Sequence, residues 1–194
     1  MSELTPISET VDCGRLATEV FQVVTKRFSE RARDIGWMTE SQSSFEEWCG
    51  WEAWLACTEN FEWDVYAKPQ YSKFGLTGTE AGDWLVDDRR GNKLFVELGI
   101  IHDGTGPKVW SDKCDGDREK LLRIADRVPG LHLILATSRL HDDIPASEKW
   151  SSRWARLRCW TLDTSLSFSA PLPEGGQMIL KAWLVVPSGL ESSP

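Results

Sequence analysis

Two acidic residues, Asp83 and Glu97, have the types and the spacing that could hold a metal ion or exchange a proton. They occur in the segment GDWLVDDRRGNKLFVELGII, residues 82–101, in which apolar and polar residues alternate on both sides of the sequence RRGN at 89–92. This pattern predicts a β-hairpin in which each strand has one apolar face and one face that can present a carboxylate. A carboxylate held between apolar neighbours is poorly solvated, and it is stable when it meets a cation or a proton. The pair is therefore a candidate site.

The elements that must position these acids are predicted from the apolar periodicity around the hairpin. Apolar residues at helical spacing favour three helices, and shorter apolar runs bounded by Gly or Pro favour strands. A strand directly after the third helix indicates a crossover connection and some parallel pairing. The predicted helices are 12–35, one that begins near Ser44, and 116–128, and the predicted strands outside the hairpin are 63–71, bent at Pro69, 131–137, 156–168 and 178–186.

Together these elements predict an α/β (α+β) fold with a mixed central β-sheet flanked by helices. The last two strands surround a turn at 171–176, which indicates an antiparallel C-terminal addition over about 150–187. A chain of 194 residues with 41% hydrophobic content can bury one good core. We therefore expect a single domain over 1–187, followed by a flexible tail at 188–194.

The composition narrows the class of function. The 22 basic and 30 acidic residues give a net charge of -8, which repels a phosphate backbone unless basic groups are gathered in one place. The eleven Trp residues are large apolar anchors, most of which we expect in the core. The five cysteines are odd in number and form no C-x-x-C pair, which indicates reduced thiols and a cytoplasmic protein. We expect neither a signal peptide nor a membrane span, because no basic start precedes an apolar segment and all apolar runs are short.

The order of the elements and the positions of the acids resemble the core of the PD-(D/E)XK, or restriction-endonuclease-like, nuclease superfamily over about residues 44–137. Glu52 matches the acidic residue that many members carry on the helix before the core, Asp83 matches the Asp of the second core strand, and Glu97 matches the Glu of the third. The segment KCDGDREKL, residues 113–121, is similar to the Lys and Asp-x-x-Lys-Leu pattern of the following helix. The resemblance implies that the three acids hold Mg²⁺ or Mn²⁺, which positions water and neutralises charge on a scissile phosphate.

Gly99 departs from the superfamily pattern, because active members usually carry a Lys two residues after the Glu. The resemblance implies that this Lys helps to activate the attacking water or stabilises charge on the phosphate. Lys93, Lys108 and Lys113 are candidate substitutes. Lys93 shares a strand face with Glu97, but about 13 Å of strand separates the two residues. Lys113, which precedes the predicted third helix, is the better candidate.

Each candidate residue also has a purely structural interpretation. A buried Glu97 paired with Lys93 or Lys113 would be a structural ion pair, and such pairs persist without catalysis. Glu52 falls on the apolar stripe of its helix, so it is either paired internally or directed at a site. His132, within an apolar strand, is typical of a hydrogen-bonded core residue rather than a metal ligand.

Two classes of function therefore remain. In the first, the protein is an intracellular, non-catalytic protein-binding module on a degenerate nuclease fold, without a cofactor, similar in character to bacterial immunity proteins and antitoxins that cover a basic toxin. In the second, it is an active Mg²⁺- or Mn²⁺-dependent nuclease that uses Glu52, Asp83, Glu97 and a relocated Lys113. Gly99 and the net charge of -8 both favour the first class. A degenerate fold that binds nucleic acid without cutting it would need a basic face that the sequence does not reveal.

Overall fold

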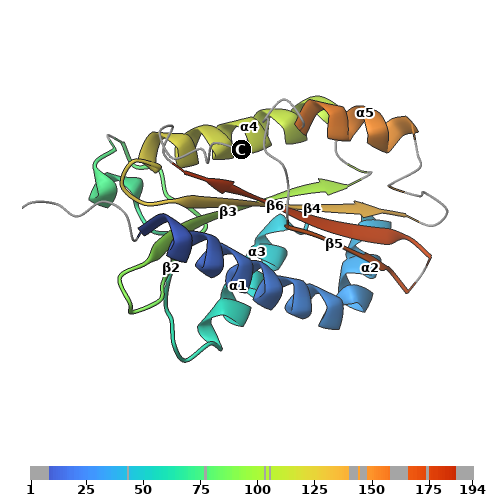
Figure 1. The fold of residues 1–194 in the computed structure, drawn as a ribbon. Helices are drawn as coiled ribbons and strands as arrows, with labels where there is room; N and C mark the ends of the chain where they lie inside the picture. Colours follow the sequence, from blue (N-terminus) through green and yellow to red (C-terminus); the bar gives the residue numbers. More distant parts are fainter. Residues whose placement is uncertain are drawn as a thin grey trace, which may run out of the picture.

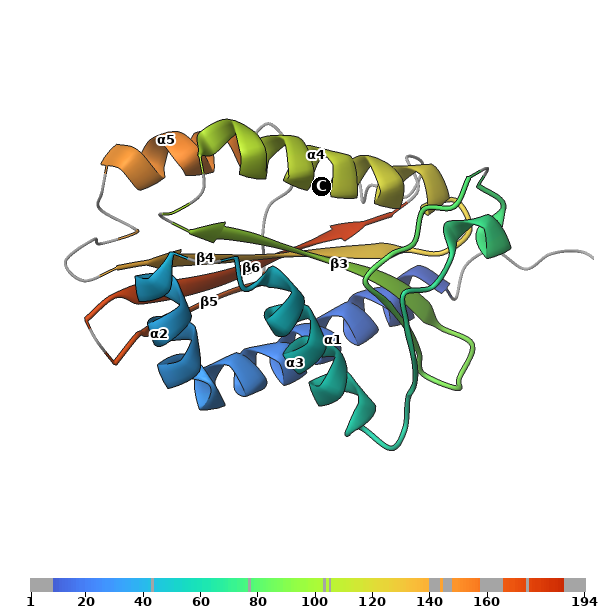
Figure 2. The ribbon, with the colours of Figure 1, turned by 180° about the vertical axis from the view of Figure 1, so that it is seen from behind.

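The computed structural model of the protein contains one mixed β-sheet with helices on both of its faces (Figures 1 and 2). It describes residues 9–42, 44–76, 78–102, 104, 106–139, 144, 148–157, 166–173 and 175–186. The helices are α1 (Glu9–Glu30), α2 (Ala32–Ser41), α3 (Glu46–Thr58), α4 (Pro107–Ile124) and α5 (Glu148–Leu157), with a 3-10 turn, η1 (Tyr71–Phe74). The strands are β1 (Asp64–Ala67), β2 (Trp84–Asp87), β3 (Lys93–His102), β4 (Gly130–Ser138), β5 (Leu166–Pro171) and β6 (Gln177–Val185). The expected fold class, a mixed sheet flanked by helices, is confirmed.

The strand order in the sheet is β1-β2-β3-β4-β6-β5. The first three strands form an antiparallel meander, and β3 pairs with β4 in parallel after the crossover through α4. Strand β6 is antiparallel to both β4 and β5. The predicted hairpin, the parallel pair and the antiparallel character of the C-terminal strands are therefore confirmed.

Helices cover both faces of the central strands. Helices α1, α2 and α3 lie on one face, and α4 and α5 lie on the other (Figures 1 and 2). In β3, Val96 and Leu98 pack in the core with α1 and α3, whereas Phe95 packs in a second cluster with residues of α4. Both faces of β3 are consequently buried, and the face that carries Glu97 packs against α4. Glu97 points toward α4 from within an apolar layer, where water cannot solvate its carboxyl group. Its protonation state therefore depends on the polar side chains around it.

Several element boundaries differ from the prediction. The first predicted helix is divided at Arg31 into α1 and α2, and α4 begins at Pro107 rather than at 116. The apolar stripe used for that prediction missed the first turns of α4, where Val109 is exposed. The start of the predicted strand 156–168 is wrong, because residues up to Leu157 belong to α5. Residues 158–165 and the predicted tail 188–194 lie outside the described residues.

Candidate functional site

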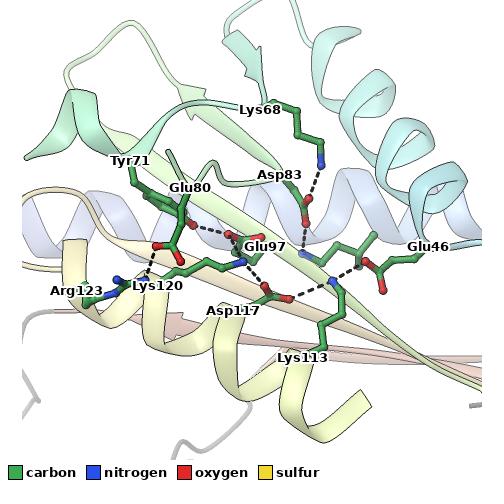
Figure 3. A network of polar contacts seen from close by, with 11 residues as sticks. Glu46, Lys68, Tyr71, Glu80, Asp83, Glu97, Lys113, Asp117, Lys120 and Arg123 are labelled. Carbon is green, nitrogen blue, oxygen red and sulfur yellow. Dashed lines mark hydrogen bonds and ion pairs between the residues drawn. The ribbon is translucent and has the colours of Figure 1, made fainter. Parts of the chain in front are cut away.

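The two hairpin acids lie across from each other at the end of β2. The register of β2 and β3 places Asp83, the residue before β2, opposite Glu97 on β3. At this point β2 no longer pairs with β3, and the backbone N–H of Leu98 donates to Asp83 Oδ2 at 2.9 Å. The ammonium group of Lys68 donates to the other oxygen, Asp83 Oδ1, at 2.8 Å (Figure 3). Both oxygens of Asp83 therefore accept hydrogen bonds from the chain itself, and these bonds keep its pKa below the ordinary value although burial opposes them.

Glu97 is a buried carboxyl group with only 2% of its surface exposed. It accepts a hydrogen bond from the hydroxyl of Tyr71, and the Lys120 ammonium nitrogen lies 4.0 Å from its Oε1 atom. Burial, reinforced by the nearby carboxylates of Asp83 and Asp117, raises the pKa of Glu97 to about 8. Glu97 is therefore mostly protonated at neutral pH.

Helix α4 contributes two lysines and one aspartate to the same place. Lys113, Asp117 and Lys120 are spaced so that they share the side of α4 that faces β3 (Figure 3). Asp117 accepts hydrogen bonds from Lys120 at 2.6 Å and from Lys113 at 3.2 Å. Lys113 also forms an ion pair at 2.5 Å with Glu46 of α3. Burial lowers the pKa of Lys113, but the carboxylates of Asp117 and Glu46 outweigh burial and raise it above its ordinary value, so this lysine stays charged.

These side chains form a cluster that is nearly neutral. We call it the lysine–acid cluster, and its charged members are Glu46, Asp83, Glu97, Asp117, Lys68, Lys113 and Lys120. With Glu97 protonated, three carboxylates face three lysines. The lysines of the chain therefore neutralise the carboxylates of the candidate site, and no ion from solution is needed for this.

Glu52, which the resemblance implied as a third acid of the site, does not join this cluster, and of its two alternatives the internal pairing is the one formed. Its Oε2 atom lies 3.4 Å from Arg27 and 3.3 Å from Arg31, so it is paired internally with the arginines at and after the end of α1. Glu46 is the acid of α3 that reaches the cluster instead. The physical reason is helix phase, because six residues of α-helix correspond to about 240° of rotation and point the two side chains to different sides.

Among the three lysines that were candidates to replace the one missing at Gly99, only Lys113 lies in the cluster. Lys93 pairs at 3.2 Å with an aspartate of β2 at the other end of the hairpin, and Lys108 is exposed on the first turn of α4. The lysine that lies 4.0 Å from Glu97 Oε1 is Lys120, from the Asp-x-x-Lys-Leu segment. The structural alternative was an ion pair of Glu97 with Lys93 or Lys113. The structure places Lys120 beside Glu97 instead.

Gly99 is in close contact with α4. A Cβ atom on Gly99 would lie 3.1 Å from the sulfur of Cys114 and 3.8 Å from Nε2 of His132. Both neighbours are buried, and burial raises the pKa of Cys114 to about 12 and lowers the pKa of His132 to about 4, so both groups are neutral. Helix α4 therefore leaves no room for a long side chain at this position.

Three members of the site were missed in the sequence. Tyr71 is one of only two tyrosines in the chain, and this rarity was the one available signal for it. Glu46 has the spacing of a solvated helix face, and Lys68 carries no local signal at all. These residues come from η1, α3 and the segment after β1, so only the tertiary fold brings them to Asp83 and Glu97.

Two pockets adjoin the cluster and share Lys68. The first, which we call the Trp pocket, has a volume of about 200 Å³ and includes Glu46, Glu47, Trp51, Trp54, Lys68 and Asp83 in its lining. The second, which we call the lysine pocket, has a volume of about 510 Å³ and includes Tyr66, Lys68, Lys73, Phe74 and Lys93. The lysine pocket gathers basic groups that are scattered along the sequence.

The carboxyl oxygens of Asp83 and Glu97 are not arranged to bind Mg²⁺. Asp83 already accepts two hydrogen bonds, and Glu97 carries a proton at neutral pH and accepts the hydroxyl of Tyr71. Mg²⁺ requires ionised oxygen ligands at close range, so Lys68 would have to leave and Glu97 would have to lose its proton. Among the residues that the structure describes, no three His, Cys, Asp or Glu side chains are grouped so that they could hold a metal ion.

Comparisons with known proteins add no family to this description. No family model, no curated protein and no solved structure matches the chain. Within the described ranges, none of the helices has the length and apolar character needed to cross a membrane.

Removing the hydroxyl of Tyr71 tests the buried hydrogen bond to Glu97. We expect Tyr71→Phe to lower the free energy of unfolding by about 1–2 kcal/mol, because a buried carboxyl oxygen loses its donor. Urea denaturation at pH 7 would measure this loss. The matched control is Tyr66→Phe at the chain's other tyrosine, which is 51% exposed and should change stability little. Equal stability of the two variants would contradict the described bond.

Proposed function

We propose that the protein is a non-catalytic protein-binding module on a degenerate PD-(D/E)XK-like fold, comparable in role to immunity proteins or antitoxins that cover a basic toxin. The observation that carries this proposal is the lysine–acid cluster. Each of its three ionised carboxylates forms an ion pair with a lysine of the same chain, at distances from 2.5 to 3.2 Å. A site stabilised in this way needs no metal ion to keep its acids in place.

The exposed apolar side chains support a protein partner. Five of the large exposed apolar residues in the described part of the chain come from the consecutive region α2 to β1: Trp37, Trp51, Leu55, Phe61 and Tyr66. Phe61 is 91% exposed. Aromatic residues of this kind are frequent hot spots of protein interfaces. The net charge of -8 would in turn accelerate association with a basic partner.

A second candidate function, a metal-dependent nuclease, is favoured by a different observation. Lys113 and Lys120 lie beside the hairpin acids, and the adjoining lysine pocket is lined by Lys68, Lys73 and Lys93. Lysines gathered in one place are what a phosphate backbone requires, although four of these five are paired with carboxylates of the chain. The same pocket would serve a degenerate fold that binds nucleic acid without cutting it.

Metal titration separates these functions. We expect isothermal titration calorimetry with Mn²⁺ and Mg²⁺ to show no binding that depends on Asp83 and Glu97, and we expect no cleavage of plasmid DNA or of RNA. The comparison uses the native chain, the Asp83→Ala, Glu97→Ala double variant, and the milder Asp83→Asn variant. Metal binding that disappears in these variants, together with cleavage by the native chain, would contradict the proposal and establish the nuclease. A control that removes two exposed acids, Glu62→Ala with Glu119→Ala, excludes a nonspecific effect of charge.

The partner surface is tested by capture with immobilised protein. We expect a basic protein to be retained by the native chain and lost when Trp51→Ala and Phe61→Ala are combined, because both side chains are exposed in the region α2 to β1. The matched control combines Val109→Ala and Leu122→Ala, which remove exposed apolar groups from α4 on the other face of the sheet. Retention that is equal in both double variants would place the interface elsewhere.

A further inference from the structure

The Trp pocket is lined by aromatic side chains and by charged groups. Helix α3 supplies Trp51 and Trp54 together with Glu46 and Glu47, whereas Lys68 follows β1 and Asp83 precedes β2. Gly50, which precedes Trp51 on α3, also lines the pocket, and a Cβ atom added to it would meet nothing within 4 Å. A larger side chain at this position would therefore extend into open space beside the pocket.

The two tryptophans are arranged so that the ring of Trp51 can contact a ligand. Their ring centroids are 5.4 Å apart with an angle of 86° between the planes, which is an edge-to-face contact. Trp51 is 44% exposed, whereas Trp54 is partly buried against the core. A ring that is fixed by its neighbour and open to solvent is suited to stacking with a planar cation. The chain contains this chemistry elsewhere, since the guanidinium of Arg33 lies 4.6 Å from the ring centroid of Trp37.

The charges at the pocket favour a positively charged occupant. Three carboxylates, those of Glu46, Glu47 and Asp83, line it with a single lysine, Lys68. Glu46 and Asp83 are paired with lysines of the cluster. Glu47 is exposed on the first turn of α3 and takes part in none of the ion pairs among the described residues. The pocket therefore keeps a negative charge beside an open aromatic ring.

We propose that the Trp pocket receives an arginine side chain presented by the protein partner. This inference rests on the proposed function and names the chemistry of the contact. A guanidinium group can stack on Trp51 while its N–H groups donate to Glu47, which a lysine ammonium group cannot do in the same planar way. The occupant also matches the basic character expected of the partner.

The first test uses the short peptides acetyl-Gly-Arg-Gly-amide and acetyl-Gly-citrulline-Gly-amide, which differ in charge but hardly in shape. Their binding to the native chain is followed by NMR from the indole N–H signals. The arginine peptide shifts the signals of Trp51 and Trp54 in a saturable way, and the citrulline peptide binds about tenfold more weakly because it has no charge. A lysine peptide also binds more weakly. Equal binding of the three peptides, or the absence of saturable shifts, overturns the proposal.

Variants of the lining residues test whether the peptide binds in the Trp pocket. Trp51→Ala removes the ring, Glu47→Gln removes the charge, and Gly50→Leu fills the open space while the ring and the carboxylates remain. Each weakens arginine-peptide binding about fivefold or more. The matched controls, which change the same residue types outside the pocket and leave binding unchanged, are Trp37→Ala, Glu119→Gln and Gly116→Leu.

Lys68 provides a change in the opposite direction. Its ammonium group is the only cation in the described lining of the Trp pocket, so Lys68→Gln tightens arginine-peptide binding, whereas Lys73→Gln in the lysine pocket does not. Loss of binding in Lys68→Gln overturns the proposal.

Failure of this inference is distinguishable from failure of the proposed function. A captured partner that binds Trp51→Ala and Glu47→Gln as well as the native chain refutes the arginine contact and leaves the binding module. Metal-dependent cleavage by the native chain refutes the binding module whatever the peptides show.

Discussion

Replacing Gly99 by Lys should lower the free energy of unfolding by about 3 kcal/mol and should create no nuclease activity. The expected loss follows from the packing of β3 against α4. A Cβ atom at this position already approaches the Cys114 sulfur to 3.1 Å, and the three further carbons and the ammonium group of Lys would have to displace the helix. Urea denaturation and a plasmid-cleavage assay with Mg²⁺ would measure the two effects.

The contact with Cys114 can be separated from the charge of the new side chain. Gly99→Ala adds only the Cβ atom, and its effect should be partly reversed by Cys114→Ala, which removes the sulfur on the other side of the contact. A stable Gly99→Lys protein that cleaves DNA would contradict our account. It would show that the glycine is the one change separating this chain from an active nuclease.

The hairpin and the central strands could be predicted from the sequence because their signals are local. Alternation on both sides of the turn at 89–92 defined β2 and β3, and the apolar run after a helix defined β4. The same signals could not show that helices cover both faces of β3. That arrangement depends on α1 and α3 as well as α4, and it is what buries Glu97.

The composition of the site could be predicted only in part. Asp83 and Glu97 were predicted from the alternation in the hairpin, and Lys113 from the resemblance to the nuclease superfamily; the structure brings all three into one cluster. Glu52 lies outside the cluster, because acids six residues apart on one helix point to different sides, and the sequence pattern could not decide between its internal pairing and a place in the site. Tyr71 reaches Glu97 from a 3-10 turn that has no strong periodic signal.

The local grouping of basic side chains could not be predicted from the sequence. No run of Lys or Arg suggested a basic site, and the net charge of -8 argued against one. The fold nevertheless gathers Lys68, Lys73 and Lys93 into one pocket from the segment after β1, from η1 and from the first residue of β3. Residues that are distant in the sequence together determine the electrostatic potential at one place on the surface, and the net charge of the chain does not predict it.

Replacing Glu97 by Gln should remove a pH dependence of stability. The native state keeps the proton of Glu97 until its pKa of about 8, whereas the unfolded chain loses it near the ordinary value of 4.5. The stability that this proton contributes is complete below pH 4.5, decreases as the pH rises, and is lost above about pH 8. At 1.36 kcal/mol for each pKa unit, the native chain should lose on the order of 5 kcal/mol from this group between these limits.

Gln keeps the shape of the side chain and an oxygen that can accept the hydroxyl of Tyr71, so Glu97→Gln should match the native chain near pH 4.5 and exceed its stability at pH 9. Urea denaturation from pH 4 to 9 would show the two curves diverging, and the exposed control Glu119→Gln should follow the native curve. Parallel curves for Glu97→Gln and the native chain would mean that Glu97 is ionised in the folded protein. The lysine–acid cluster would then carry an uncompensated carboxylate, which is the state that Mg²⁺ requires, and the nuclease would become the better explanation of the site.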